Sequence, residues 1–161
     1  MKRNSGLFCL IIILVIFIDQ VTKYLAVANI ELYGAFQVIP GFFSIVNARN
    51  RGMAFGLLNN PHPGPAFYFL TGASVFAVFL ITFWFFRLKD YEKILITGLA
   101  LILGGALGNL IDRLRIGEVI DFIDVQIGTY HWPAFNIADS SISVGTIWVA
   151  VCLLFFINPD N

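Results

Sequence analysis

Carboxylates are the side chains of this sequence best suited to chemistry. Neither a His-Glu-x-x-His zinc motif nor a Gly-x-Ser-x-Gly nucleophile motif occurs in it. His62 and His131 stand singly in separate segments, so a Ser-His or Cys-His mechanism has little support. Two neighbouring carboxyl groups cannot both ionise cheaply, so one keeps a proton for the substrate carbonyl while the other takes a proton from water. Asp121 and Asp139 lie where loops meet the ends of apolar segments, and water could reach both.

Asp19 and Lys23 form a second polar group inside an apolar segment. They stand four residues apart, which places them on one helical face with the acidic residue first, the favourable order. An ionisable residue at membrane depth is costly unless it is paired or hydrated, so both are functional candidates. The alternative is an ion pair that only anchors the helix end, with Lys23 reaching to the interface. Spacing alone favours this structural alternative.

Asn109, Asp112 and Arg113 form a third group. Spacings of three and four place them on one helical face, where an Asp–Arg pair and an amide could brace neighbouring helices. Gly104 and Gly108 are also four apart and permit close helix approach in lipid. Bracing is favoured here over direct chemistry.

Two further acidic groups flank the last apolar segment. Glu118, Asp121 and Asp124 lie in a strand-like stretch, and the odd separation of the two aspartates places them on opposite faces of a regular strand. At most one of them should therefore share a site with a given third group. Asn136 and Asp139 open the final segment with the spacing of a helix capping box, which is as good an explanation of Asp139 as a functional role.

Four apolar blocks form the framework that must hold these polar groups. A bilayer core of roughly 30 Å needs about 20 helical residues, and each block reaches that length with its flanks. A soluble domain of this size could not bury a composition of 58% hydrophobic and 12% charged residues. The sequence therefore predicts one all-α membrane domain over residues 1–161, a four-transmembrane-helix bundle with spans at about 7–28, 66–86, 94–112 and 138–157.

A cleaved secretory signal peptide is the alternative for the first block. Lys2 and Arg3 precede its apolar run, and small residues at 26–28 resemble a cleavage site. Asp19 and Lys23 argue against cleavage, because that stretch of a signal peptide is uncharged. The other three spans remain in either case.

The loops predict a small β element on one side of the membrane. Residues 35–50 have strand-like character broken at Pro40-Gly41, and residues 119–127 are strand-like up to a turn at Gly128. Lys and Arg divide five to five between the two sides, so the positive-inside rule does not decide the orientation. The short charged loop at 87–93 and the basic N-terminus favour cytoplasmic termini and an extracytoplasmic β-rich platform. With zero net charge and no basic tract, nucleic acid is not expected as a partner.

Five blocks of the sequence match a known family in order. They are Asp19-x-x-Thr22-Lys23, Asn50-x-Gly52-x-Ala54-Phe55, Gly104-Gly105-Ala106-x-Gly108-Asn109-x-x-Asp112-Arg113, Val119-x-Asp121-Phe122 and Phe135-Asn136-x-Ala138-Asp139. Together they strongly resemble the lipoprotein signal peptidase (type II signal peptidase) family of bacteria. The resemblance spans residues 19–139, and the helix pattern fits outside it. Met53 and Arg51 depart from the small residues expected there, which leaves the shape of that loop open.

The resemblance implies a four-helix aspartic endopeptidase of the bacterial cytoplasmic membrane. Such enzymes remove the signal peptide of prolipoproteins just before a cysteine that carries a diacylglyceryl group, without a metal or organic cofactor. Its substrate would be a lipid-modified prolipoprotein within membrane lipid, and no obligate protein partner is implied. The catalytic pair would be Asp121 and Asp139. The residues that would bind substrate or brace the site are Asp19, Lys23, Asn50, Gly52, Ala54, Phe55, Gly108, Asn109, Asp112, Arg113, Asn136 and Ala138.

Two functions of other classes remain as alternatives. A proton- or ion-coupled transporter would use Asp19, Asp112 and Asp139 as a relay, but the internal repeat typical of such proteins is missing from the sequence. A purely structural membrane protein would need none of these carboxylates for chemistry. The five blocks favour the peptidase over both.

Overall fold

The computed structural model describes residues 2–51, 65–89 and 92–156. Within these ranges it contains four long helices, α1 (Lys2–Asn29), α2 (Pro65–Arg87), α3 (Leu95–Ile116) and α4 (Ile137–Phe155). All four are long and apolar enough to cross a membrane. Large apolar side chains face outward along them: Phe17 is 63% exposed, Phe69 74% and Leu154 76%. Outward apolar faces of this extent are expected only where lipid is the solvent, so the predicted multi-pass membrane fold is confirmed.

Helix α3 is the centre of the bundle. Buried residues make up 67% of its most apolar stretch, against 6% for α2. Glycines let it approach its neighbours closely, because a β-carbon on Gly98 would lie 2.9 Å from the carbonyl oxygen of Gly145 on α4. On the face toward α1, a β-carbon on Gly104 would lie 2.8 Å from that of Val15. The prediction that Gly104 and Gly108 permit close helix approach is therefore confirmed.

Helix α3 extends four residues beyond the predicted end at 112. Hydropathy marks only the length of helix in contact with apolar surroundings, and the last turn of α3 carries Arg113 and Arg115. The helix ends at Gly117, whose left-handed φ of 76° is readily available only to glycine. As a result, Asp112 and Arg113 are helical residues and not part of the loop that follows.

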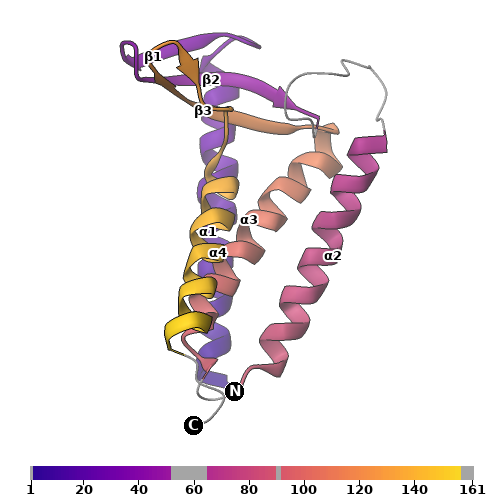
Figure 1. Cartoon of the computed structure of the whole chain (residues 1–161). Coiled ribbons are helices and arrows are strands. Elements are labelled where there is room, and N and C mark those ends of the chain that lie inside the picture. The colour runs from indigo at the N-terminus through magenta and orange to yellow at the C-terminus, as the bar shows by residue number, and fades with distance from the viewer. Residues whose placement is uncertain (1, 52–64, 90–91, 157–161) are drawn as a thin grey trace.

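A four-stranded antiparallel sheet crosses one end of the bundle, in the order β1 (Ala35–Ile39), β2 (Phe43–Asn50), β3 (Val119–Ile127) and β4 (Tyr130–His131). The predicted turns are present, with Gly41 at φ 72° between β1 and β2 and Gly128 at φ 65° between β3 and β4. The beginning of α1 and the end of α4 lie at the opposite end of the bundle from the sheet (Figure 1). The predicted β-rich platform on a helical bundle is confirmed.

Strand β3 is irregular, contrary to the premise of the alternation argument. The amides of Phe122 and Ile123 both donate to the carbonyl oxygen of Phe135, at 3.1 and 2.9 Å, as in a β-bulge. Alternation across this point therefore does not decide which way Asp124 faces. Asp124 pairs with His131 of β4, 3.0 Å away, so this histidine is part of the sheet and not an isolated loop residue.

Candidate active site

Asp121 lies on β3 where the sheet meets the helices, and its side chain is held from two sides. It is only 2% exposed. Asn136 Nδ2 donates to its Oδ1 at 2.7 Å, and Asn50 Nδ2 donates to its Oδ2 at 2.9 Å. Asn50 belongs to the neighbouring strand β2, and Asn136 is the residue that caps the N-terminus of α4. The carboxyl group is therefore fixed by the sheet on one side and by the bundle on the other.

Asp139 lies in the first turn of α4. Asn109 Nδ2 of α3 donates to its Oδ1 at 2.7 Å. The predicted capping box is present: the backbone amide of Asp139 donates to Asn136 Oδ1 at 2.9 Å, and the backbone amide of Asn136 donates to Asp139 Oδ2 at 3.3 Å. Asn136 thus donates to both carboxyl groups, to that of Asp121 from its side-chain amide and to that of Asp139 from its backbone amide. Capping therefore does not exclude a functional role, because both carboxyl groups converge on one asparagine.

The environment of Asp121 favours its protonated form. Burial raises its pKa to about 6, and the negative charge of Asp139 acts in the same direction. The hydrogen bonds from Asn50 and Asn136 and the charge of Lys23 oppose this rise. An electrostatic coupling between two aspartates is the condition under which a pair retains one proton.

Lys23 is the centre of a buried brace behind the two aspartates. Its ammonium group has three N–H donors, and three acceptors lie within reach: Asp112 Oδ2 at 2.7 Å, Asp19 Oδ2 at 2.8 Å and Asn109 Oδ1 at 3.0 Å. Lys23 is 1% exposed, so the interpretation of this residue as an interfacial anchor is wrong. The predicted pair with Asp19 is confirmed, but it is one part of a larger cluster that joins α1 to α3.

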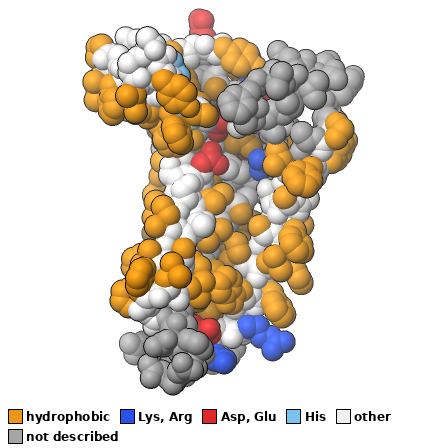
Figure 2. Space-filling model, in the orientation of Figure 1, with side chains coloured by type: hydrophobic (Ala, Val, Ile, Leu, Met, Phe, Trp, Pro, Cys, Tyr) orange, Lys and Arg blue, Asp and Glu red, His pale blue; other side chains and the backbone are white. Residues whose placement is uncertain are grey.

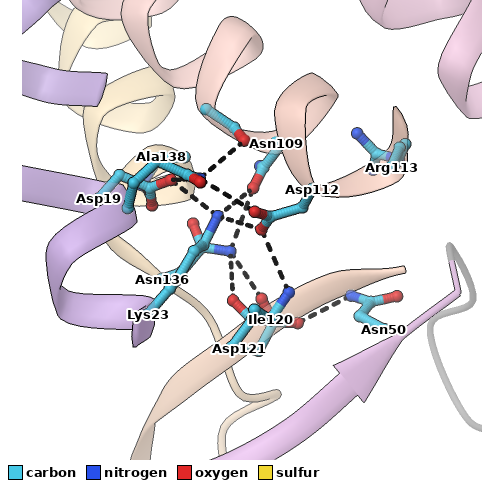
Figure 3. Close-up of polar contacts among 12 residues, drawn as sticks. Asp19, Lys23, Asn50, Asn109, Asp112, Arg113, Ile120, Asp121, Asn136 and Ala138 are labelled. Carbon is cyan, nitrogen blue, oxygen red and sulfur yellow. Dashed lines mark hydrogen bonds and ion pairs between the residues drawn. The ribbon is translucent and has the colours of Figure 1, made fainter. Parts of the chain in front are cut away.

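Asn109 connects this brace to the aspartates. Its Oδ1 accepts from Lys23 and, at 3.2 Å, from Asn136, while its Nδ2 donates to Asp139. These partners fix the orientation of the amide, since the oxygen faces two donors and the nitrogen faces a carboxylate. Figure 3 shows Lys23, Asn109, Asn136 and Asp121 as parts of one continuous polar network.

Asp19 and Asp112 complete the brace from two helices. Asp19 is fully buried, and its Oδ1 accepts from the backbone amide of Ala138 at 2.9 Å. That amide belongs to the first turn of α4 and has no partner within the helix, so Asp19 satisfies an otherwise unpaired donor. Asp112 accepts from Lys23 and also, at 3.4 Å, from the backbone amide of Ile120 on β3. The brace therefore positions both α4 and β3, the elements that carry the two aspartates.

Gln20 belongs to the brace and was not predicted. Its Nε2 donates to Asp112 Oδ1 at 2.9 Å and to Asp19 Oδ2 at 3.2 Å. The only signal in the sequence is that a polar amide stands inside an apolar run directly after Asp19. Asn136 was predicted, but its contact with both aspartates was not, because spacing along the chain reveals only its capping role.

Arg113 does not form the predicted pair with Asp112. Asp112 pairs instead with Lys23, while Arg113 Nη1 donates to Ser74 Oγ of α2 at 3.2 Å. In Figure 3 Arg113 lies apart from the network. Its positive charge still acts on the site, because Asp139, Asp112 and Asp121 are near enough to interact with it electrostatically. Gly52, Ala54 and Phe55, with the Pro-rich segment and His62 that follow them, lie outside the described residues.

A methyl group at position 108 should disturb this brace. A β-carbon on Gly108 would lie 2.7 Å from Asp19 Oδ2. We expect Gly108→Ala to lower the free energy of unfolding by about 1–3 kcal/mol, because either the carboxylate or the helix must shift. The measurement is SDS-induced unfolding in mixed micelles.

Gly72→Ala is the matched control for Gly108→Ala. Gly72 lies on α2, and a β-carbon added to it would have no atom within 4 Å, so a slight stabilisation of about 0.5–1 kcal/mol is expected. Equal stability of Gly108→Ala and the wild type would show that α1 and α3 are less tightly packed than described.

The sequence profile of the family described as signal peptidase (SPase) II matches residues 11–155, which is nearly the whole chain. The chain belongs to the signal peptidase II family. Its relatives include lipoprotein signal peptidases of Oleidesulfovibrio alaskensis, 49% identical over 95% of this chain and 97% of that protein, and of Staphylococcus aureus, 40% identical over 95% and 91%.

Solved structures agree with this membership of the signal peptidase II family. A bacterial membrane enzyme determined by the in meso method at 1.9 Å resolution is similar with a TM-score of 0.79 and 36% identity, over 94% of this chain and 95% of that one. A second such enzyme, at 2.3 Å resolution, gives a TM-score of 0.78 and 37% identity over 92% and 88%. The arrangement of helices and sheet is therefore that of solved bacterial membrane enzymes.

Proposed function

We propose that this signal peptidase is an aspartic endopeptidase that cleaves prolipoproteins before the lipid-modified cysteine, with Asp121 and Asp139 as its catalytic pair. The observation that carries the proposal is the convergence of both carboxyl groups on Asn136, where the sheet meets the bundle. At this level the peptide can reach the site from the water while its lipid stays in the membrane. Figure 2 shows apolar side chains along the helices, and charged ones at the top of the molecule, below the sheet and at the opposite end.

The chemistry requires one proton shared by the pair. The ionised carboxylate accepts a proton from a water molecule, whose oxygen attacks the scissile carbonyl carbon. The protonated carboxyl hydrogen-bonds the carbonyl oxygen and transfers its proton as the tetrahedral intermediate forms. When that intermediate collapses, one of its hydroxyl groups returns a proton to the pair, the pair gives a proton to the leaving nitrogen, and the C–N bond breaks. The pair again holds one proton after each turnover, and no step requires a metal or an organic cofactor.

The substrate is a prolipoprotein whose diacylglyceryl chains lie between the helices while the peptide enters below the sheet. Asn50, Asn109 and Asn136 hold the aspartates, and Asp19, Lys23, Asp112, Gly108 and Ala138 brace them from behind. Arg113, Gly52, Ala54 and Phe55 complete the proposed substrate-binding and bracing set. Its proposed partners are the lipid-modified prolipoprotein and membrane lipid, and no obligate protein partner is implied.

Cleavage of a diacylglyceryl-modified prolipoprotein by the purified enzyme in detergent tests this function directly. Release of the signal peptide with the lipidated cysteine at the new N-terminus is the expected result. Lack of cleavage, together with ion flux in protein-containing vesicles that hold no peptide, would instead support the transporter alternative.

A bell-shaped dependence of kcat/KM on pH is expected. Activity should fall as pH rises through about 6, because the raised pKa of Asp121 marks loss of the shared proton in the free enzyme. Activity should also fall at acidic pH, where both carboxyl groups are protonated and no base remains. Asn50→Ala should move the alkaline limb to higher pH, because the hydrogen bond from Asn50 lowers the pKa of Asp121.

The pH profile should survive strong chelation. Activity lost on adding a chelator and restored by a divalent ion would contradict the proposed mechanism. The same would hold for an alkaline limb that does not move in Asn50→Ala.

We propose that the enzyme lies in the bacterial cytoplasmic membrane with both termini in the cytoplasm and the sheet on the extracytoplasmic side. A reporter that fluoresces only in the cytoplasm should therefore be active when fused after α4. A secreted phosphatase fused at the same point should be inactive. The opposite pattern would show that the orientation is the reverse of the one proposed and that the site faces the cytoplasm.

A further inference from the structure

A pocket of about 440 Å³ lies between the end of α1 and the sheet, and neither Asp121 nor Asp139 lines it. Its walls come from the last turns of α1, with Leu25, Ala26 and Asn29, and from the sheet, with Phe36 of β1, Ile45 of β2 and Phe122 of β3. Pockets of 300–1,000 Å³ are the size at which proteins bind small ligands. None of these residues has a part in the proposed chemistry.

The pocket is suited to hydrocarbon and not to a polar ligand. Thr22 also lines it, but its hydroxyl donates to the carbonyl oxygens of Ile18 and Asp19, at 2.7 and 3.0 Å. Asn29 Nδ2 likewise donates to the carbonyl oxygen of Leu25 at 2.8 Å. The polar side chains of the wall therefore donate hydrogen bonds to backbone carbonyl groups of their own helix. The rest of the lining is apolar and includes Leu25, Phe36, Ile45 and Phe122.

The position of the pocket makes membrane lipid its natural source of hydrocarbon. Its lower wall is the end of the membrane-spanning segment Ser5–Asn29. We expect the hydrocarbon core to give way to the headgroups near the end of such a segment. Leu25 is 52% exposed and Phe36 63%, so the pocket opens outward and continues the lipid-facing surface of α1. Tyr24 beside it is 71% exposed, as is typical of an aromatic residue at the membrane interface.

We propose that this pocket binds an acyl chain of a membrane phospholipid and that the bound chain supports the strand that carries Asp121. Phe122 directly follows Asp121 and is 8% exposed. The two side chains have different surroundings, because Phe122 lines the pocket while the carboxyl group of Asp121 accepts from Asn136. The substrate's own lipid must reach the aspartate face, which leaves the pocket to a separate membrane lipid. Without a chain, β3 would rest on a void and Asp121 would be less firmly positioned.

Native mass spectrometry of the enzyme released from detergent tests the binding. The wild type should retain one phospholipid. Ala26→Phe should lose it, because the phenyl ring fills the pocket at a wall residue. Ala150→Phe is the matched control, an identical change on the exposed face of α4, and should keep the lipid. Loss of lipid from both variants, or from neither, would overturn the proposal.

The effect on activity rests on the proposed function and is measured separately. Wild-type enzyme stripped of lipid should cleave prolipoprotein several-fold more slowly and recover when phosphatidylglycerol or phosphatidylethanolamine is added. Ala26→Phe should cleave at the same rate with and without added lipid, because its phenyl ring takes the place of the acyl chain. An equal response of both enzymes would overturn the supporting role of the lipid, whereas absence of cleavage in every sample would instead contradict the peptidase.

If Ala26→Phe does not fold, Phe36→Ala provides the same test from the exposed wall of the pocket. It removes a ring that covers the chain, so retention of lipid should fall. Unchanged retention in Phe36→Ala would again overturn the proposal.

Discussion

Replacing either Asp121 or Asp139 with asparagine is expected to lower kcat by at least about a thousandfold. Asparagine can neither accept a proton from water nor give one to the substrate, and the single remaining carboxyl group cannot do both at once. Asparagine keeps the shape of the side chain, and its oxygen can still accept from Asn136 or Asn109. Both variants should therefore fold. The measurement is single-turnover cleavage of a lipid-modified prolipoprotein.

Asp124→Asn is the matched control for this result. Asp124 lies on the same strand but pairs with His131, so its loss should leave cleavage nearly unchanged. If Asp121→Asn or Asp139→Asn kept most of its activity while Asp124→Asn lost it, the catalytic pair would have to be reassigned. If all three were fully active, the carboxylates would be structural.

Lys23→Met should destabilise the fold more than any other single change considered for the brace. It would leave Asp19 and Asp112, which are 0% and 2% exposed, as buried carboxylates without their cation. Removing one member of a buried ion pair typically costs about 3–5 kcal/mol, mainly because the other charge stays buried and unpaired. SDS-induced unfolding in mixed micelles measures the loss.

A version of the brace without charges separates the effect of unpaired buried carboxylates from simple loss of packing. Adding Asp19→Asn and Asp112→Asn to Lys23→Met should restore part of the stability, since no unpaired charge then remains. Lys93→Met, on an exposed lysine, should change the free energy of unfolding by no more than about 0.5 kcal/mol. A Lys23→Met variant as stable as Lys93→Met would show that water reaches the brace.

Local patterns predicted the framework of this enzyme correctly. Long apolar blocks with few polar residues revealed the four membrane helices, since a lipid-facing helix needs no amphipathic pattern. Pro40-Gly41 and Gly128 revealed the turns of the sheet, because their backbone geometry is set within a few residues. The pair of Asp19 with Lys23 and the capping box of Asn136 with Asp139 are also local, three or four residues apart.

The contacts between helices could not be predicted in the same way. Asp112 has a cation directly after it in the sequence, Arg113, but pairs with Lys23 of another helix. Only the packing of α1 against α3 brings these two side chains together, and spacing along one helix carries no information about that. Gln20 was missed for the same reason, because its partners Asp19 and Asp112 meet only in the folded bundle.

The strand that carries Asp121 and Asp124 shows a different limit. Alternation holds only in a regular strand, but the amides of Phe122 and Ile123 both donate to the carbonyl oxygen of Phe135. A bulge inserts a residue and interrupts the period of two, and no residue at 121–124 marks it in the sequence. The separation of the two aspartates therefore follows from their partners, Asn136 and His131, and not from strand periodicity.

Glycine contacts along α3 restrict which parts of the enzyme can move during turnover. At Gly104 and Gly108 it meets α1, and at Gly98 and Gly105 it meets α4, at distances that leave no room for a β-carbon. Sliding or tilting these helices would bring α3 into collision with side chains of α1 and with the backbone of α4, so the three should behave as one rigid column. Helix α2 packs chiefly against α3 and exposes most of its surface. We therefore expect admission of the substrate's lipid to depend on displacement of α2, a lateral gate that opens while the spacing of the two aspartates stays constant.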